Sequence, residues 1–132
     1  MRQLKTYIIE DSPVIRQSLI ETLEELVPVT VVGFAEDELT ALHWLAEPRN
    51  PVDLVIVDLF LKNGSGLGVL RNMKPSLFPC KIVVLSNYAT KDIRQKCLEL
   101  GADQVFDKST EIESLIAYCG DLADGQVESL SN

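Results

Sequence analysis

Apolar residues gather in five short runs along the chain, and β-branched residues are frequent in them. Within each run the apolar positions are nearly continuous rather than alternating with polar ones. A strand that buries both faces gives this pattern, because neither set of its alternating side chains meets water. The runs therefore predict buried strands of a parallel sheet at residues 6–9, 29–32, 54–57, 82–85 and 104–106.

Between these runs the apolar residues take helical spacing, three or four positions apart. Ser12 and Pro13 suit the N-cap and first position of the first helix, which follows the first run. Thr110 and Glu113 have the spacing of a capping box before the last helix, and Ser65 is predicted to cap the third. The predicted inward faces are Ile15, Leu19, Thr22 and Leu26; Leu39, Leu42 and either Leu45 or Ala46; Leu67, Leu70 and Met73; Ile93, Cys97 and Leu100; and Ile112, Leu115, Ile116 and Cys119.

Strands and helices alternate five times, which implies parallel pairing through right-handed crossovers. Five units are too few to close a common barrel. The expected fold is a doubly wound α/β sandwich of the (βα)5, flavodoxin-like type, with strand order 2-1-3-4-5. A length of 132 residues suits one such domain, which we assign to residues 1–122. Residues 123–132 are polar and are predicted to form a C-terminal tail.

The chain carries 20 acidic and 12 basic residues, a formal net charge of −8 at pH 7. Such a surface repels phosphate backbones and anionic lipid headgroups, so we expect neither nucleic-acid nor membrane binding. We find no signal-peptide pattern and no apolar window of the roughly 18 residues that a membrane span needs. Cys80, Cys97 and Cys119 match no metal-binding spacing, and the single histidine, His43, lies far from them. The cysteines suit a reducing, cytoplasmic environment.

Polar residues that can carry chemistry follow four of the five predicted strands. Glu10 and Asp11 follow the first strand, Asp58 the third, Ser86 the fourth, and Lys108 comes shortly after the fifth. Open α/β sheets place their functional sites outside the carboxyl ends of the strands. Strands one, three and four are neighbours in the predicted order, so we expect these side chains to meet at one edge of the sheet.

Three carboxylates packed together repel one another and raise each other's pKa. Mg²⁺ relieves this repulsion, because it prefers a shell of carboxylate, water and phosphate oxygens. A carboxylate can also attack phosphorus and form an aspartyl phosphate. The transferred group then needs partners for its three oxygens, and Mg²⁺, Lys108 and Ser86 can supply them. The set therefore predicts phosphoryl transfer to Asp58.

Each of these residues also has a simpler interpretation when it is taken alone. Asp11 can complement the dipole of the first helix, Ser86 can be a turn residue, and Lys108 can be a solvated lysine. Their joint placement at strand ends favours function, because independent causes rarely align in this way. The glycine-rich segment 63–68 lacks the last glycine of a dinucleotide fingerprint and follows the wrong strand, so we interpret it as a turn.

These residues resemble the motifs of the response-regulator receiver family, and the likeness runs from about residue 4 to about residue 122. The resemblance implies that Asp58 is the phosphoacceptor and that Ser86 and Lys108 contact the phosphoryl oxygens. The implied Mg²⁺ ligands are Glu10, Asp11, Asp58 and the backbone carbonyl of Phe60.

Several positions depart from the usual pattern of that family. The family commonly has alanine or glycine after the serine or threonine, and this small residue leaves an open path to the phosphoryl group. In this chain the position is Asn87. Phe60 and Tyr88 add further bulk, and we predict that they shield this group from water. Val105 occupies the usual position of the switch aromatic, while Phe106 should face the other side of the sheet. The aromatic readout of the family therefore lacks its usual residue.

The sequence thus predicts a stand-alone phosphorylation switch and not an enzyme acting on other substrates. The resemblance implies a histidine kinase or histidine phosphotransfer protein as donor, docked on the first helix. Output would pass to a downstream protein or a second copy through the fourth helix, fifth strand and fifth helix. Alternatives are a receiver within a longer regulator, a phosphate sink, and a Mg²⁺-dependent phosphotransfer enzyme, whose usual Asp-x-Asp pattern is missing at Asp58. An FMN site would need a phosphate-binding loop where Glu10 and Asp11 stand.

Overall fold

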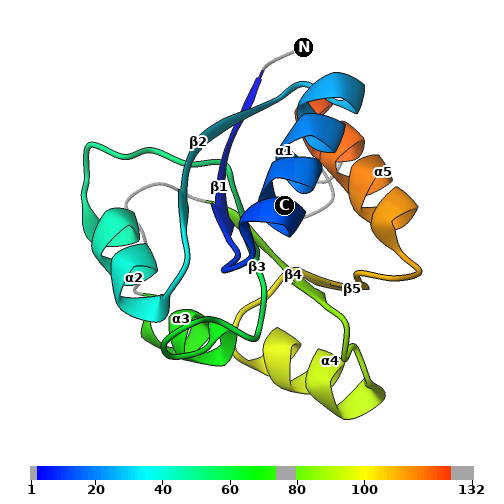
Figure 1. Cartoon of the computed structure of the whole chain (residues 1–132). Helices are drawn as coiled ribbons and strands as arrows, with labels where there is room; N and C mark the ends of the chain where they lie inside the picture. The colour runs from blue at the N-terminus through cyan, green and yellow to red at the C-terminus, as the bar shows by residue number, and fades with distance from the viewer. Residues whose placement is uncertain (1–2, 74–79, 126–132) are drawn as a thin grey trace.

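The computed structural model describes residues 3–73 and 80–125. These residues form a five-stranded parallel sheet in the order β2-β1-β3-β4-β5, with a helix after each strand (Figure 1). The predicted doubly wound α/β fold is confirmed. The strands are β1 Leu4–Ile9, β2 Val29–Ala35, β3 Leu54–Val57, β4 Lys81–Ser86 and β5 Gln104–Asp107. The helices are α1 Pro13–Leu26, α2 Glu38–Ala46, α3 Gly66–Asn72, α4 Lys91–Glu99 and α5 Ile112–Ala123.

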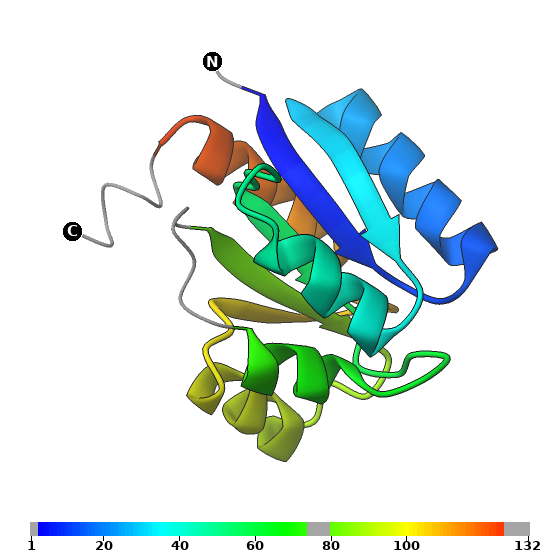
Figure 2. The same cartoon turned by 90° about the vertical axis from the view of Figure 1, so that its left-hand side faces the viewer.

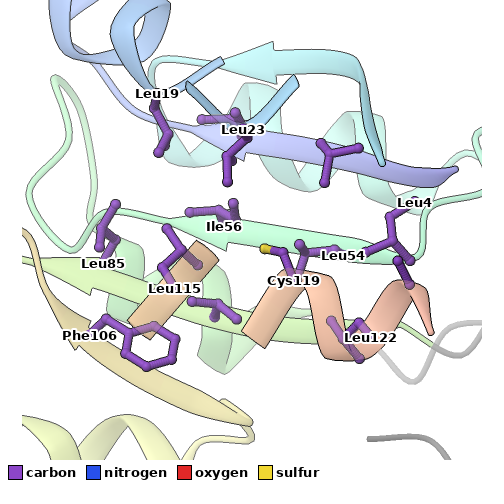
Figure 3. Packing of buried hydrophobic residues seen from close by; sticks show 14 residues of the cluster. Leu4, Leu19, Leu23, Leu54, Ile56, Leu85, Phe106, Leu115, Cys119 and Leu122 are labelled. Carbon is purple, nitrogen blue, oxygen red and sulfur yellow. The ribbon is translucent and has the colours of Figure 1, made fainter. Parts of the chain in front are cut away.

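The helices cover the two faces of the sheet as separate layers. Helices α1 and α5 lie on one face, and α2, α3 and α4 lie on the other (Figure 1 and Figure 2). In β3, Leu54 and Ile56 join the core packed against α1 and α5 (Figure 3). Val55 and Val57 join the second core, beneath the other three helices. Both sets of alternating side chains are buried, which explains the continuous apolar run.

Strand β2 runs through Ala35, beyond the predicted end at residue 32. The register against β1 shifts between Thr6 and Tyr7, where the Tyr7 ring lies against Gly33 and leaves no room for a Cβ atom without a shift. The longer strand reaches the residue after β1, since the Glu10 N–H donates to the Ala35 carbonyl at 2.9 Å. The last residue of β2 therefore fixes the backbone of the first acidic residue.

Two predicted helix caps are confirmed and one is wrong. The Ser12 hydroxyl accepts from the Ile15 N–H at 3.3 Å, and the Ser65 hydroxyl accepts from the Gly68 N–H at 3.0 Å. The predicted capping box at Thr110 is absent, because α5 begins two residues later, after Glu111. The Asp107 carboxylate accepts from the Thr110 N–H at 3.2 Å and thereby forms the turn before the helix.

The inward faces of α1 and α2 agree only in part with those predicted. Leu42 and Leu45 of α2 pack against the second core as predicted, but other positions differ. Helix α1 buries Leu19 and Leu23, while Leu26 is 59% exposed. Helix α2 buries Ala41, and Leu39 is 79% exposed. In α2 the ring of Trp44 stacks on Tyr7 with centroids 4.0 Å apart, and this contact decides which side of the helix faces the sheet.

The last helix passes the predicted domain boundary by one residue. Ala123 belongs to α5 and is buried in the first core, so the predicted tail cannot begin there. Residues 126–132 of the predicted tail lie outside the described residues. Within residues 3–73 and 80–125, every helix is too short or too polar to cross a lipid bilayer.

Candidate functional site

Parallel strands bring the predicted polar residues to one edge of the sheet. Glu10 and Asp58 directly follow the adjacent strands β1 and β3, and Ser86 ends β4. Lys108 follows β5, and its backbone N–H donates to the Ser86 carbonyl at 3.0 Å. Glu10, Asp58 and Ser86 are among the few buried polar side chains of the described residues. The predicted meeting of these residues is therefore present in the fold.

The Lys108 ammonium bridges two of the acids. Its Nζ lies 2.6 Å from Glu10 Oε1 and 2.9 Å from Asp58 Oδ2, and its side chain is only 10% exposed. Burial by itself lowers the pKa of Lys108, but the hydrogen bonds and charges of Glu10 and Asp58 outweigh burial and raise it. Lys108 therefore carries its positive charge at neutral pH and partly neutralises the acidic group.

Glu10, Asp11 and Asp58 each present a carboxylate oxygen within 4.8 Å of the others. The remaining Glu10 oxygen, Oε2, accepts from the Ser12 N–H at 3.1 Å, so the N-terminus of α1 orients this side chain. The pKa of Asp11 is raised, first by burial and then by the hydrogen bond and negative charge of Glu10. One lysine is thus insufficient to offset three acids, and the group retains an attraction for a further cation.

We expect Asp11→Asn to raise the Tm of the metal-free protein at pH 7. The raised pKa means that folding disfavours the charged Asp11, and this cost is fully present above the folded pKa. It disappears as the pH falls through the folded pKa to the unfolded one, so the two proteins should converge in acid. Thermal unfolding in EDTA at several pH values checks this. Equal Tm values for both proteins at every pH would contradict the expectation, and Asp121→Asn on the exposed side of α5 is the control.

Two exposed aromatic residues belong to the loops that follow Asp58 and Ser86. The rings of Phe60 and Tyr88 meet edge to face, with centroids 5.3 Å apart, and are 60% and 62% exposed. The Tyr88 N–H donates to the buried Ser86 hydroxyl at 3.0 Å, and the Phe60 N–H lies 3.4 Å from Asp58 Oδ1. Asn87 directly precedes Tyr88, and its Oδ1 accepts from the Ser109 hydroxyl at 3.4 Å. The backbone N–H of each aromatic residue is thus bound to a side chain, that of Ser86 or Asp58.

Val105 and Phe106 face opposite sides of the sheet, as predicted. Val105 is buried in the second core and Phe106 in the first, where its ring meets Tyr118 at a centroid distance of 6.1 Å. Val105 therefore offers no side chain to the surface, and only its backbone carbonyl is bound by a charged group, Arg94, at 2.9 Å.

Sequence patterns did not reveal the role of Arg16, which binds the backbone of the acidic group. Its Nη1 donates to the Glu10 carbonyl at 2.9 Å and to Glu36 Oε2 at 3.0 Å. Its guanidinium also lies 4.0 Å from the centroid of the Phe34 ring. In the structure the Arg16 side chain is only 11% exposed, on a helix that starts at this edge of the sheet. The sequence does not reveal this burial, so it gave no signal for Arg16.

Comparisons with known proteins agree on one family. The family model described as response regulator receiver domain matches residues 6–119. A probable transcriptional regulatory protein of Picosynechococcus is 34% identical over 117 residues, which are 85% of this chain and 46% of that protein. The transcriptional regulatory protein YdfI of Bacillus subtilis is 30% identical over 84% of this chain and 51% of its own length. The chain thus spans about half the length of these relatives.

Solved structures show the same fold at lower identity. The signal receiver domain of the putative response regulator NarL from Mycobacterium tuberculosis superposes with a TM-score of 0.80 at 21% identity, covering 95% of this chain and 99% of that chain. The response regulator domain of Thermotoga maritima CheB gives 0.76 at 20% identity, covering 99% and 98%. With the family match over residues 6–119, the chain belongs to the response regulator receiver domain family, whose members signal through a phosphorylated aspartate.

Proposed function

We propose that Asp58 is the phosphoacceptor of this receiver domain. The observation that carries the proposal is the salt bridge of Lys108 to Asp58 and Glu10 in a nearly buried group. A buried carboxylate held 2.9 Å from an ammonium is a candidate nucleophile. Glu10 holds the same ammonium from the other side, so Lys108 is near the oxygen of any group that Asp58 acquires.

The donor set suits Mg²⁺. Three carboxylate oxygens within 4.8 Å of one another are hard oxygen ligands of the kind that Mg²⁺ binds through one or two carboxylates and water. We propose Glu10, Asp11, Asp58 and the backbone carbonyl of Phe60 as its ligands. When bound, the ion would neutralise charge on the reacting phosphoryl group.

The residues of the chain have separate tasks in the transfer. An Asp58 oxygen attacks phosphorus, and the bond between phosphorus and the donor's leaving atom breaks. Lys108 turns its ammonium from Asp58 to one phosphoryl oxygen. The Ser86 hydroxyl accepts from the Tyr88 N–H, so its own hydrogen can be donated to a second oxygen. The hydrogen bond from the Lys108 N–H to the Ser86 carbonyl fixes the positions of these two residues relative to each other.

A small phosphodonor tests the proposal. The protein is incubated with Mg²⁺ and acetyl phosphate and its intact mass is measured. We expect a gain of one phosphoryl group that EDTA prevents and that Asp58→Asn abolishes, while Asp121→Asn retains it. Absence of the gain in the wild-type chain, or its survival in Asp58→Asn, would refute Asp58 as the acceptor.

A groove of about 410 Å³ leads away from Lys108 between α1 and α5. Its walls include Ile15 and Leu19 of α1 and Ile112 of α5, so it is largely apolar. We propose that a histidine kinase or histidine phosphotransfer protein docks here in the cytoplasm. Its phosphohistidine would then reach Asp58 past Asn87, which also lines the groove. A downstream protein or a second copy would bind the surface of α4, β5 and α5.

We expect Tyr88→Ala to shorten the phosphorylated lifetime severalfold. We propose that its ring, which meets that of Phe60 edge to face, covers the approach to Asp58, so that its loss admits water to the phosphoryl group. The measurement is the decay of the phosphorylated mass after acetyl phosphate is removed. Leu98→Ala, which removes an exposed apolar side chain of α4, is the control. A lifetime equal to that of the wild type would show that the pair does not shield the site.

A further inference from the structure

Arg94 of α4 bonds to three separate segments of the chain. Its Nε donates to the Ala89 carbonyl at 2.9 Å, and its Nη1 donates to the Val105 carbonyl at 2.9 Å. Its Nη2 lies 2.6 Å from Glu111 Oε1, just before α5. One guanidinium therefore joins the loop after β4, the edge strand β5 and the loop before α5 (Figure 1).

Glu111 extends this contact towards the acidic group. The same oxygen, Oε1, accepts from the Asp107 N–H at 2.8 Å, directly before Lys108. The Lys108 N–H in turn donates to the Ser86 carbonyl, and Ser86 belongs to the segment that leads to Ala89. Arg94 and Glu111 thus close a ring of bonds around the two loops that carry the ammonium and the hydroxyl.

We infer that the Arg94–Glu111 pair is a positioning device for Lys108 and Ser86, and that it couples the surface of α4, β5 and α5 to Asp58. The inference rests on the proposed function of Asp58. If the backbone at Asp107 shifts when Lys108 turns to a phosphoryl oxygen, its bond to Glu111 would pass that shift to Arg94. The Val105 side chain is buried and takes no part, but its carbonyl is one of the three groups that Arg94 holds.

The partial exposure of the Arg94–Glu111 pair is suited to a link between Asp58 and the surface of α4, β5 and α5. The side chains of Arg94 and Glu111 are 35% and 33% exposed, so a protein bound on this face can reach both. Binding that strengthens or breaks the pair would then change the position of Lys108, and by linkage phosphorylation would change the affinity for that protein.

The geometry depends on arginine. The planar guanidinium presents donors in a fixed fork and satisfies all three acceptors at once, whereas lysine has a single ammonium on a flexible stem. We therefore expect Arg94→Lys and Arg94→Gln to be similarly impaired, because retaining the positive charge does not restore the bonds. Glu111→Gln retains an acceptor oxygen and should be impaired less. Arg71→Gln, at an exposed site of α3, is the matched control.

Two measurements on the full chain test the inference. The first is the rate of phosphorylation by acetyl phosphate with Mg²⁺, which should fall roughly 2- to 30-fold in Arg94→Lys. The second is amide hydrogen exchange with and without Mg²⁺ and beryllium fluoride, which mimics a phosphoryl group on a carboxylate. The wild type and Arg71→Gln should change protection in α4 on adding the mimic. Arg94→Lys should still bind it, with protection changing around Asp58 but not in α4.

The outcomes separate this inference from the proposed function. A wild-type chain that gains no phosphoryl mass refutes the role of Asp58. A wild-type chain that is phosphorylated, together with Arg94 variants that keep its rate and its α4 response, overturns the positioning role alone. Circular dichroism and Tm establish that each variant is folded, and Glu111→Ala, which removes the acceptor oxygen, provides the same test if an Arg94 variant does not fold.

Discussion

Lys108→Met is expected to slow phosphorylation of Asp58 by about 10²–10³-fold, while Mg²⁺ binds about three- to tenfold more tightly. The two effects have opposite signs because Lys108 has two roles. In the unphosphorylated state its ammonium lies against Glu10 and Asp58 and competes with any other cation for their charge. During transfer the same ammonium is a donor to the phosphoryl group, and methionine cannot replace it.

The measurements are the phosphorylation rate with acetyl phosphate at saturating Mg²⁺ and a Mg²⁺ titration followed by nuclear magnetic resonance. Lys96→Met removes an equal charge from an exposed position of α4 and should leave both values unchanged. If Lys108→Met weakened Mg²⁺ binding, Lys108 would be organising the acids and not competing with the ion. An unchanged phosphorylation rate would remove it from the transfer step.

Gly66→Ala is expected to destabilise the fold by about 3 kcal/mol and to abolish phosphorylation with it. A Cβ at this position would overlap the Asp58 carbonyl oxygen and lie 2.8 Å from the Leu59 Cα and 2.9 Å from the Asp58 carbonyl carbon. All three are backbone atoms, so no side-chain rotation can relieve the clash. The Gly66 N–H also donates to the Leu59 carbonyl at 2.9 Å, which holds α3 against the segment that carries Asp58.

Gly120→Ala is the matched control and should have the opposite sign. The nearest atom to a Cβ at Gly120 is Val27 Cγ1 at 3.9 Å, and the position lies inside α5. Alanine is the better helix former by about 0.5–1 kcal/mol, so this variant should be slightly more stable. Urea unfolding of both variants checks the pair. A Gly66→Ala protein as stable as the wild type would mean that the backbone at Asp58 and Leu59 can move aside at little energetic cost.

The residues with candidate chemistry were predictable because a parallel sheet converts order along the chain into position in space. Each strand ends at the same edge, so a polar residue directly after a buried run must lie there. Asp58 and Ser86 were placed in this way, without any knowledge of their contacts. Ser12 and Ser65 were predictable for a related reason, since a cap contacts a backbone group only three residues away.

The same local reasoning failed where a more distant contact decides the outcome. Thr110 had the spacing of a capping box, but Asp107 forms the turn and α5 begins after Glu111. Leu39 had the spacing of an inward residue, but it is exposed, while Ala41 of the same helix is buried and Trp44 stacks on Tyr7.

The sequence by itself determined the five alternating strands and helices and the acidic group with its lysine and serine, because these follow from short-range patterns and from the geometry of parallel strands. Only the tertiary structure decided which long side chains connect the elements. Arg16 reaches Glu36 across 20 positions, and Arg94 reaches Glu111 across 17. A flexible guanidinium can point to many partners, and the packing of the helices on the sheet selects one. The physical support of Asp58 is therefore a property of the folded chain.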